Sequence, residues 1–118
     1  MEDLSNSSII NSSLQPKDID EDALCEMLGN EECRKIYLCI QESPKIARHI
    51  MLATNIPNTT LYRKLTWLLD KGLIGGMIQK HSKKRQSDRV LFYPVIKSIK
   101  IDFDSTGVKK TIKLEQTQ

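Results

Sequence analysis

Two stretches of the chain concentrate side chains that suit an anionic or hydrogen-bonding ligand. Residues 58–64 contain two threonines, an asparagine, a tyrosine, an arginine and a lysine. Residues 80–89 form a basic run that Asp88 alone opposes. Arginine and lysine pair with phosphate, and arginine, asparagine and threonine also bind the edges of nucleobases. The residue types in both stretches therefore favour a nucleic acid or another polyanion.

The charge is uneven along the chain, although the net charge is only +3. Residues 1–32 carry nine acidic residues and one basic residue, whereas residues 33–89 carry twelve basic and three acidic residues. An asymmetry of this kind is typical of a basic region that binds a polyanion. The alternative is an ordinary solvated surface. We favour the polyanion because the basic residues coincide with the two stretches above.

The cysteines and histidines do not predict a metal site. Cys25, Cys33 and Cys39 form no Cys-x-x-Cys pair, and the sequence has only two histidines, His49 and His81. We expect the cysteines to be small core residues, with no metal and no cofactor. There is also no glycine-rich phosphate loop or Ser/His/Asp arrangement, so we expect no enzymatic activity.

Four segments show the apolar periodicity of helices, after a polar segment at 1–17 that we expect to be disordered. Apolar residues at three- and four-residue spacing predict helices over about 18–28, 31–42, 44–54 and 59–71. Their expected N-caps are Asp18, Asn30, Ser43 and Asn58, and Gly29 and Gly72 are expected as left-handed C-terminal residues.

A short turn, Asn55-Ile56-Pro57, separates the third and fourth helices. Pro57 disfavours helical geometry at Ile56, whose side chain we expect to fill the core between the helices. The inner faces of these helices are expected to comprise Ala47, Ile50, Met51 and Thr54, and then Leu61, Leu65, Leu68 and Leu69.

Strand-like alternation follows the last helix. Residues 73–80 and 89–95 predict an antiparallel pair, whose register stays open because both alternating sets are apolar. Gly75-Gly76 is interpreted as a bend or bulge. Residues 96–103 and 108–114 predict a second pair around the turn 104–107, with Ile99, Ile101 and Phe103 on one face.

A helix pair followed by a hairpin with a basic tip predicts an α+β fold, the winged helix-turn-helix. We expect a tail at 1–17, a DNA-binding domain at 18–95 and a C-terminal β-hairpin at 96–118 that packs on this domain or dimerises it. In such a fold the second helix of the pair enters the major groove of double-stranded DNA. We therefore expect a cytoplasmic, nucleoid-associated regulator of transcription.

The docking of this fold gives each candidate side chain a role. The N-terminal end of helix 59–71 faces bases and phosphates, and Arg63 is placed to bond guanine. The basic tip contacts flanking backbone or the minor groove. Trp67 is expected to be a half-buried packing residue. The candidate DNA-binding residues are Asn58, Thr59, Thr60, Tyr62, Arg63, Lys64, Lys45, Lys80, His81, Lys83, Lys84, Arg85 and Arg89.

The segment IPNTTLYRKLTWLLDKGLI resembles the recognition helix of winged-helix regulators of the arsenical-resistance-repressor (ArsR) superfamily. The segment GNEECRKIYLCIQESPK is similar to the first core helix of that family. The likeness covers about residues 20–115 and is greatest to small archaeal ArsR-like proteins, which also end in strands. It implies a homodimeric transcription regulator, with Thr59, Thr60, Tyr62 and Arg63 at the DNA-reading positions.

The chain departs from the metal-sensing members of that family. The segment 46–54 lacks their Cys-x-Cys motif, and strands replace the long C-terminal dimer helix. The candidates for a dimer surface are the helix at 20–28 and the last hairpin. The competing hypothesis is a winged-helix module for protein–protein interaction, in which the acidic segment 18–32 is the working surface.

Overall fold

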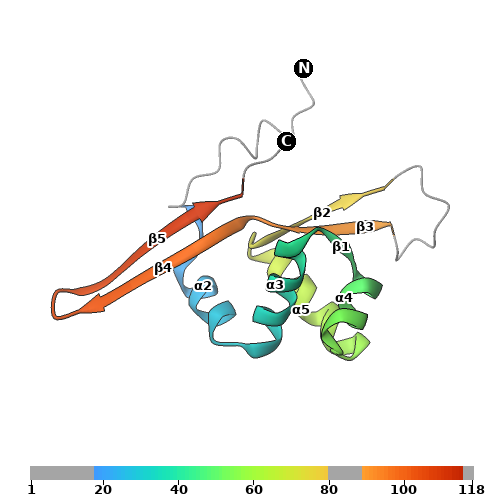
Figure 1. Cartoon of the computed structure of the whole chain (residues 1–118), viewed down its shortest axis with the longest axis horizontal. Helices are drawn as coiled ribbons and strands as arrows, with labels where there is room; N and C mark the ends of the chain where they lie inside the picture. Colours follow the sequence, from blue (N-terminus) through green and yellow to red (C-terminus); the bar gives the residue numbers. More distant parts are fainter. Residues whose placement is uncertain (1–17, 80–88, 116–118) are drawn as a thin grey trace, which may run out of the picture.

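The computed structural model describes residues 18–79 and 89–115. Within these ranges the protein is α+β, with four α-helices and two antiparallel sheets (Figure 1). This architecture is compatible with a helix-turn-helix followed by a hairpin. The elements are α2 (Glu21–Leu28), α3 (Glu31–Glu42), β1 (Lys45–Ile46), α4 (Ala47–Thr54), α5 (Asn58–Asp70), β2 (Ile74–Ile78), β3 (Val90–Pro94), β4 (Ile96–Asp104) and β5 (Gly107–Leu114).

The helices lie together on one side of the strands in the view of Figure 1. One sheet has the strand order β1-β3-β2, and the other consists of β4 and β5. Only Val95 separates β3 from β4, and the β2–β3 and β4–β5 hairpins point in opposite directions from this junction (Figure 1). The helical body therefore sits between two hairpins that extend beyond it at opposite ends.

The N-terminus of α2 is fixed by Asp20. Its carboxylate accepts hydrogen bonds from the backbone N–H groups of Asp22 at 2.9 Å and Ala23 at 3.3 Å. The prediction of Asp18 as the cap was wrong because Ile19, just before Asp20, is drawn into the core, where it is 7% exposed. An apolar residue before the cap commonly packs against the first turns of a helix and fixes where the helix begins.

The ends of α2 and α3 test two more predictions. Asn30 caps α3 as predicted, its side chain accepting from the Cys33 N–H at 2.9 Å. Gly29 ends α2, but with a right-handed φ of −82° and not the predicted left-handed conformation. Because the connection is so short, the next residue, Asn30, is already the N-cap of α3.

The strand β1 interrupts the predicted helix 44–54. Lys45 pairs with Phe92 and Ile46 with Leu91, so α4 begins only at Ala47, and Ser43 is not its cap. The backbone groups of Lys45 and Ile46 are satisfied by a strand much later in the chain, which no local pattern reveals. Similarly, α5 begins one residue early, so Asn58 is its first helical residue and Pro57 holds the N-cap position.

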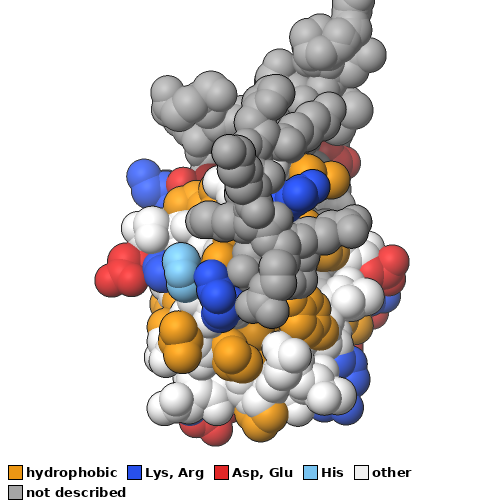
Figure 2. Space-filling view, turned by 90° about the vertical axis from the view of Figure 1, so that its right-hand side faces the viewer, with side chains coloured by type: hydrophobic (Ala, Val, Ile, Leu, Met, Phe, Trp, Pro, Cys, Tyr) orange, Lys and Arg blue, Asp and Glu red, His pale blue; other side chains and the backbone are white. Residues whose placement is uncertain are grey.

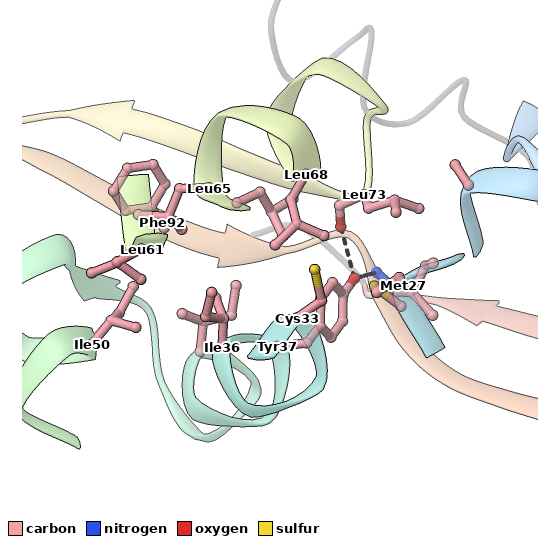
Figure 3. Packing of buried hydrophobic residues seen from close by; sticks show 14 of the residues in the cluster. Met27, Cys33, Ile36, Tyr37, Ile50, Leu61, Leu65, Leu68, Leu73 and Phe92 are labelled. Carbon is pink, nitrogen blue, oxygen red and sulfur yellow. Dashed lines mark hydrogen bonds between the residues drawn. The ribbon is translucent and has the colours of Figure 1, made fainter. Parts of the chain in front are cut away.

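The core forms where the helices meet the first sheet (Figure 3). Most predicted core residues are buried in it, including Ile56 at 4% exposure. Leu69 is an exception: it is 40% exposed, because it lies at the edge of α5 beside Gly76 and not under the helix. Met51 and Thr54 are only half-buried. The Thr54 hydroxyl donates to the Ile50 carbonyl at 2.7 Å.

The predicted bulge at Gly75-Gly76 is absent from the β2–β3 ladder, whose described pairs run continuously from Ile74–Pro94 to Ile78–Val90. Gly75 instead leaves room for a neighbouring side chain. A Cβ atom on Gly75 would lie 2.2 Å from Cζ of Tyr93, so the tyrosine ring occupies the space that a side chain would need.

Tyr37 joins the helices to both sheets through its buried hydroxyl. The hydroxyl donates to the Leu73 carbonyl at 2.7 Å and accepts from the N–H groups of Ile96 at 2.8 Å and Val95 at 3.2 Å. Figure 3 shows this hydroxyl at the meeting point of the core elements. Burial raises the pKa of Tyr37 to about 12, although the backbone donors partly oppose the shift.

We predict that Tyr37→Phe destabilises the protein by about 1–3 kcal/mol, because buried backbone groups lose their partner. Urea denaturation at neutral pH measures this change. The control Tyr62→Phe alters a side chain that is 39% exposed, and surface changes stay within about 0.5 kcal/mol. Equal effects of the two variants would contradict a special role for the Tyr37 hydroxyl.

The raised pKa of Tyr37 adds a pH signature. An unfolded tyrosine ionises near pH 10, so the free energy of unfolding should fall as the pH rises from about 10 towards the folded value. The measurement is denaturation in this alkaline window, and Tyr37→Phe should show a weaker dependence than the unmodified chain.

Candidate nucleic-acid interface

Three residues determine the shape of the turn between α4 and α5. Asn55 adopts the left-handed conformation with φ of 61°, which lets the chain leave α4 sharply. Ile56 fills the core, and Pro57 precedes α5 in extended geometry. Leu61, Leu65 and Leu68 then bury one side of α5. The opposite side of α5 is thereby forced outward.

The outward face of α5 carries polar residues at helical spacing. Thr59, Arg63 and Thr66, separated by four and three positions, are all exposed. Asp70 continues this face at the C-terminal end, so the cationic and hydroxyl groups of the face precede its one acidic residue. Thr66 was not among the predicted site residues, although its spacing from Arg63 is the signal that identifies it.

The N-terminus of α5 differs from those of α2 and α3. In the described part of the chain, no side chain caps α5, and none caps α4, whereas Asp20 and Asn30 cap α2 and α3. Its first turn also contains no acidic residue. Backbone N–H groups at such a helix end, together with the helix dipole, favour an anion such as phosphate.

The remaining candidates on α5 divide between its two flanks. Tyr62 lies on the flank of Leu69, which packs beside Gly76 of β2. Thr60, Lys64 and Trp67 lie on the other flank, towards α3. The Lys64 ammonium is 4.0 Å from the Glu32 carboxylate, and the lysine side chain is only 20% exposed.

A small pocket of about 170 Å³ separates that flank from the α2–α3 connection. Trp67 is half-buried there and packs against the core, as the sequence predicted. Arg63, which is exposed on the outward face, also lines the pocket. The pocket is lined by Glu26, Asn30, Cys33, Arg63, Lys64 and Trp67.

Lys45 lies in β1, shortly after the C-terminal end of α3. Its ammonium donates to the Cys39 carbonyl at 2.7 Å and contacts the Glu42 carboxylate at 3.3 Å and the Ser43 hydroxyl at 3.1 Å. A cation at this end of a helix interacts favourably with the helix dipole. The side chain therefore anchors β1 to α3, a role that the sequence analysis missed.

The predicted basic hairpin is only partly described. Lys80, His81, Lys83, Lys84 and Arg85 lie outside the described residues, between β2 and β3 in the sequence. At the base, the Gln79 N–H donates to the Arg89 carbonyl at 2.8 Å, and Arg89 is half-buried. Figure 2 shows the end of the molecule to which this hairpin points, with Lys or Arg side chains on either side of a histidine.

The cysteines do not gather into a metal site. Within residues 18–79 and 89–115, no three His, Cys, Asp or Glu side chains form a group able to hold a metal ion. Cys33 is buried, Cys39 is half-buried and Cys25 is exposed. Burial raises the pKa of both the Cys33 and Cys39 thiols, which keeps them in the less reactive protonated form.

No family model matches the chain. No curated protein matches it either. In the described ranges, no helix is both long and apolar enough to cross a membrane.

We predict that a thiol reagent at mildly alkaline pH modifies Cys25 first and Cys33 last, because Cys25 is exposed and burial raises the pKa of the Cys33 and Cys39 thiols. The progress curve of a chromogenic disulfide reagent measures this order, and the Cys25→Ser variant should lose the fast phase. A fast phase that survives in Cys25→Ser would contradict the described burial of Cys33 and Cys39.

Proposed function

We propose that the protein is a winged-helix regulator of transcription that binds double-stranded DNA as a homodimer. The observation that carries the proposal is the N-terminal half of α5, which is exposed, uncapped by any described side chain and rich in hydroxyl and cationic groups. This helix follows a short turn after α4 and precedes the β2–β3 hairpin, whose connecting sequence is strongly basic.

The order of elements supports the winged-helix interpretation. Strand β1 lies between the first core helix and the helix pair, and it pairs with β3 beside β2. This pairing ties the described strands of the hairpin to the helix pair. A helix that reads bases and a hairpin that contacts flanking backbone need such a fixed relation.

In this proposal the side chains of α5 make different contacts with DNA. Arg63 and Thr66 reach base edges in the major groove, and Thr59 and the free helix N-terminus hold a phosphate. Tyr62, on the flank of α5 that also carries Leu69, contacts the DNA backbone beside the hairpin. Lys64 pairs with Glu32, and its main contribution is then to the orientation of α5.

The first test is fluorescence anisotropy with two duplexes, one of random sequence and one from the region upstream of the protein's own gene. Each phosphate neutralised adds about 0.9 to the slope of log K against log salt. We expect a steep salt dependence with a preference for the upstream duplex. Absence of binding at low salt would overturn the proposal and favour the protein-interaction alternative.

We predict that Arg63→Ala lowers affinity for the preferred duplex by about 1–3 kcal/mol and relaxes its base preference. The random duplex should be affected less, because it lacks the specific guanine contact. Lys35→Ala is a suitable control, since Lys35 is an exposed cation on α3 that pairs with Glu31 at 3.4 Å. An equal loss on both duplexes would contradict base reading by Arg63.

We predict a different result for Lys84→Ala, in the basic connection of the hairpin. Affinity should fall by a similar factor on both duplexes, and the salt slope should decrease by about 1, as loss of one phosphate contact requires. Titrations at several salt concentrations measure both quantities. An unchanged slope would remove Lys84 from the proposed contacts.

A further inference from the structure

The pocket of about 170 Å³ beside α5 has walls from three parts of the chain. Glu26 comes from α2, Asn30 and Cys33 come from the start of α3, and the rest of the lining comes from α5. We call it the Trp67 pocket, after the half-buried ring that lines it. Trp67 is also the only tryptophan in the sequence, so the tryptophan fluorescence of the protein reports on this pocket alone.

Two opposite charges that line the Trp67 pocket are not neutralised by any described side chain. Glu26 and Arg63 are both exposed, and within residues 18–79 and 89–115 neither side chain has an ion-pair or hydrogen-bond partner. Lys64 differs, because its ammonium lies 4.0 Å from the Glu32 carboxylate. The pocket thus presents one carboxylate and one guanidinium to a ligand, and the two charges together sum to zero.

Asn30 adds a hydrogen-bond donor to these charges. Its Oδ1 atom accepts from the Cys33 N–H at 2.9 Å. Its Nδ2 group has no partner among the described residues, so it is left to donate to a ligand. An amide N–H group of this kind suits a carboxylate oxygen. The pocket therefore has two donors for a carboxylate, one charged and one neutral.

Cys33 shows that the charged side chains act on one small region. It lines the pocket and is buried, with 3% exposure. Burial raises the pKa of its thiol, the Lys64 ammonium opposes this shift, and the Glu32 and Glu26 carboxylates reinforce it. Charges carried by α2, α3 and α5 are thus close enough to act on the same buried group. This proximity supports a single small site between the three helices.

The volume of the Trp67 pocket limits what can occupy it. Pockets for drug-sized ligands have about 300–1,000 Å³, whereas a cavity of roughly 150 Å³ holds one benzene molecule. A pocket of about 170 Å³ therefore suits a ligand with fewer than about ten non-hydrogen atoms. This size excludes a nucleotide and matches a small amino acid.

We propose that the Trp67 pocket binds a small zwitterion, namely an α-amino acid with a short aliphatic side chain. The carboxylate of the ligand pairs with the Arg63 guanidinium and the Asn30 amide, and its ammonium group pairs with the Glu26 carboxylate. The aliphatic side chain packs against the ring of Trp67. A simple anion would be repelled by Glu26 and a simple cation by Arg63, so neither satisfies both charges.

Tryptophan fluorescence of the full chain, titrated without DNA, tests the proposal. The probes are L-valine and L-leucine up to about 10 mM, a range that covers millimolar dissociation constants. We expect a saturable change with at least one of them. Isothermal titration calorimetry of the same samples detects binding that leaves the fluorescence unchanged.

Analogues with a single charge separate the two ends of the ligand. Isobutylamine and isoamylamine lack the carboxylate of valine and leucine, whereas isovalerate and isocaproate lack the ammonium group. Each analogue should bind at least about tenfold more weakly than its amino acid, as loss of a charge-assisted hydrogen bond requires.

Two variants test the protein side of the same contacts. Glu26→Gln and Arg63→Gln should each lower the affinity for the amino acid at least about tenfold. The matched controls are Glu31→Gln and Lys35→Gln, since these exposed residues of α3 pair with each other at 3.4 Å and do not line the pocket. The controls should leave the affinity unchanged, and thermal unfolding checks that each variant folds.

Three results would overturn the proposal: no saturable signal by either method with either amino acid, equally tight binding of a single-charge analogue, or equal losses in the variants and their controls. The site does not depend on the proposed function, although Arg63 serves in both. Glu26→Gln should still bind a random duplex at low salt. Amino-acid binding by a chain that binds no duplex would reject the DNA function alone.

Discussion

The hydroxyl group of Tyr37 is the point on which the arrangement of the molecule depends. It connects α3 with the residue before β2 and with the junction between β3 and β4. Gln41, one turn later on α3, adds bonds from its amide to the carbonyls of Ile96 at 2.9 Å and Lys97 at 3.0 Å. One side of α3 therefore fixes where both hairpins leave the helical body. The junction between the hairpins has little freedom to move, because its backbone groups are buried and hydrogen-bonded to these side chains.

This junction also separates the two hairpins. The β2–β3 hairpin extends beside α4 and α5, and the β4–β5 hairpin extends past α2 (Figure 1). Acidic and basic side chains nevertheless meet beside α5, where Glu32 pairs with Lys64 and Glu26 lines the same pocket as Arg63.

The sequence predicted those features of the candidate site that depend on the spacing of residues within one helix. The spacing of Leu61, Leu65 and Leu68 determined which side of α5 is buried, and hence that Thr59 and Arg63 face outward. The same reasoning made both Lys64 and Arg63 candidates for DNA contact. Both are cations on the same helix, but Glu32 on α3 holds Lys64, and nothing near Lys64 in the sequence indicates that neighbour. Lys45 differs in this respect, because its partners Cys39, Glu42 and Ser43 lie within six residues of it in the sequence.

By itself, the sequence determined the helices, the turns and the strand pairs, because apolar periodicity, Asn30 at its cap, the Ile56-Pro57 break and Gly107 act within a few residues. The tertiary structure alone decided the pairing of β1 with β3, the ring of Tyr93 over Gly75 and the position of the Tyr37 hydroxyl. Each of these joins residues distant in the chain, whose backbone and side chains meet only when the core closes. Local propensity cannot encode such contacts, because their free energy is gained only in the folded chain.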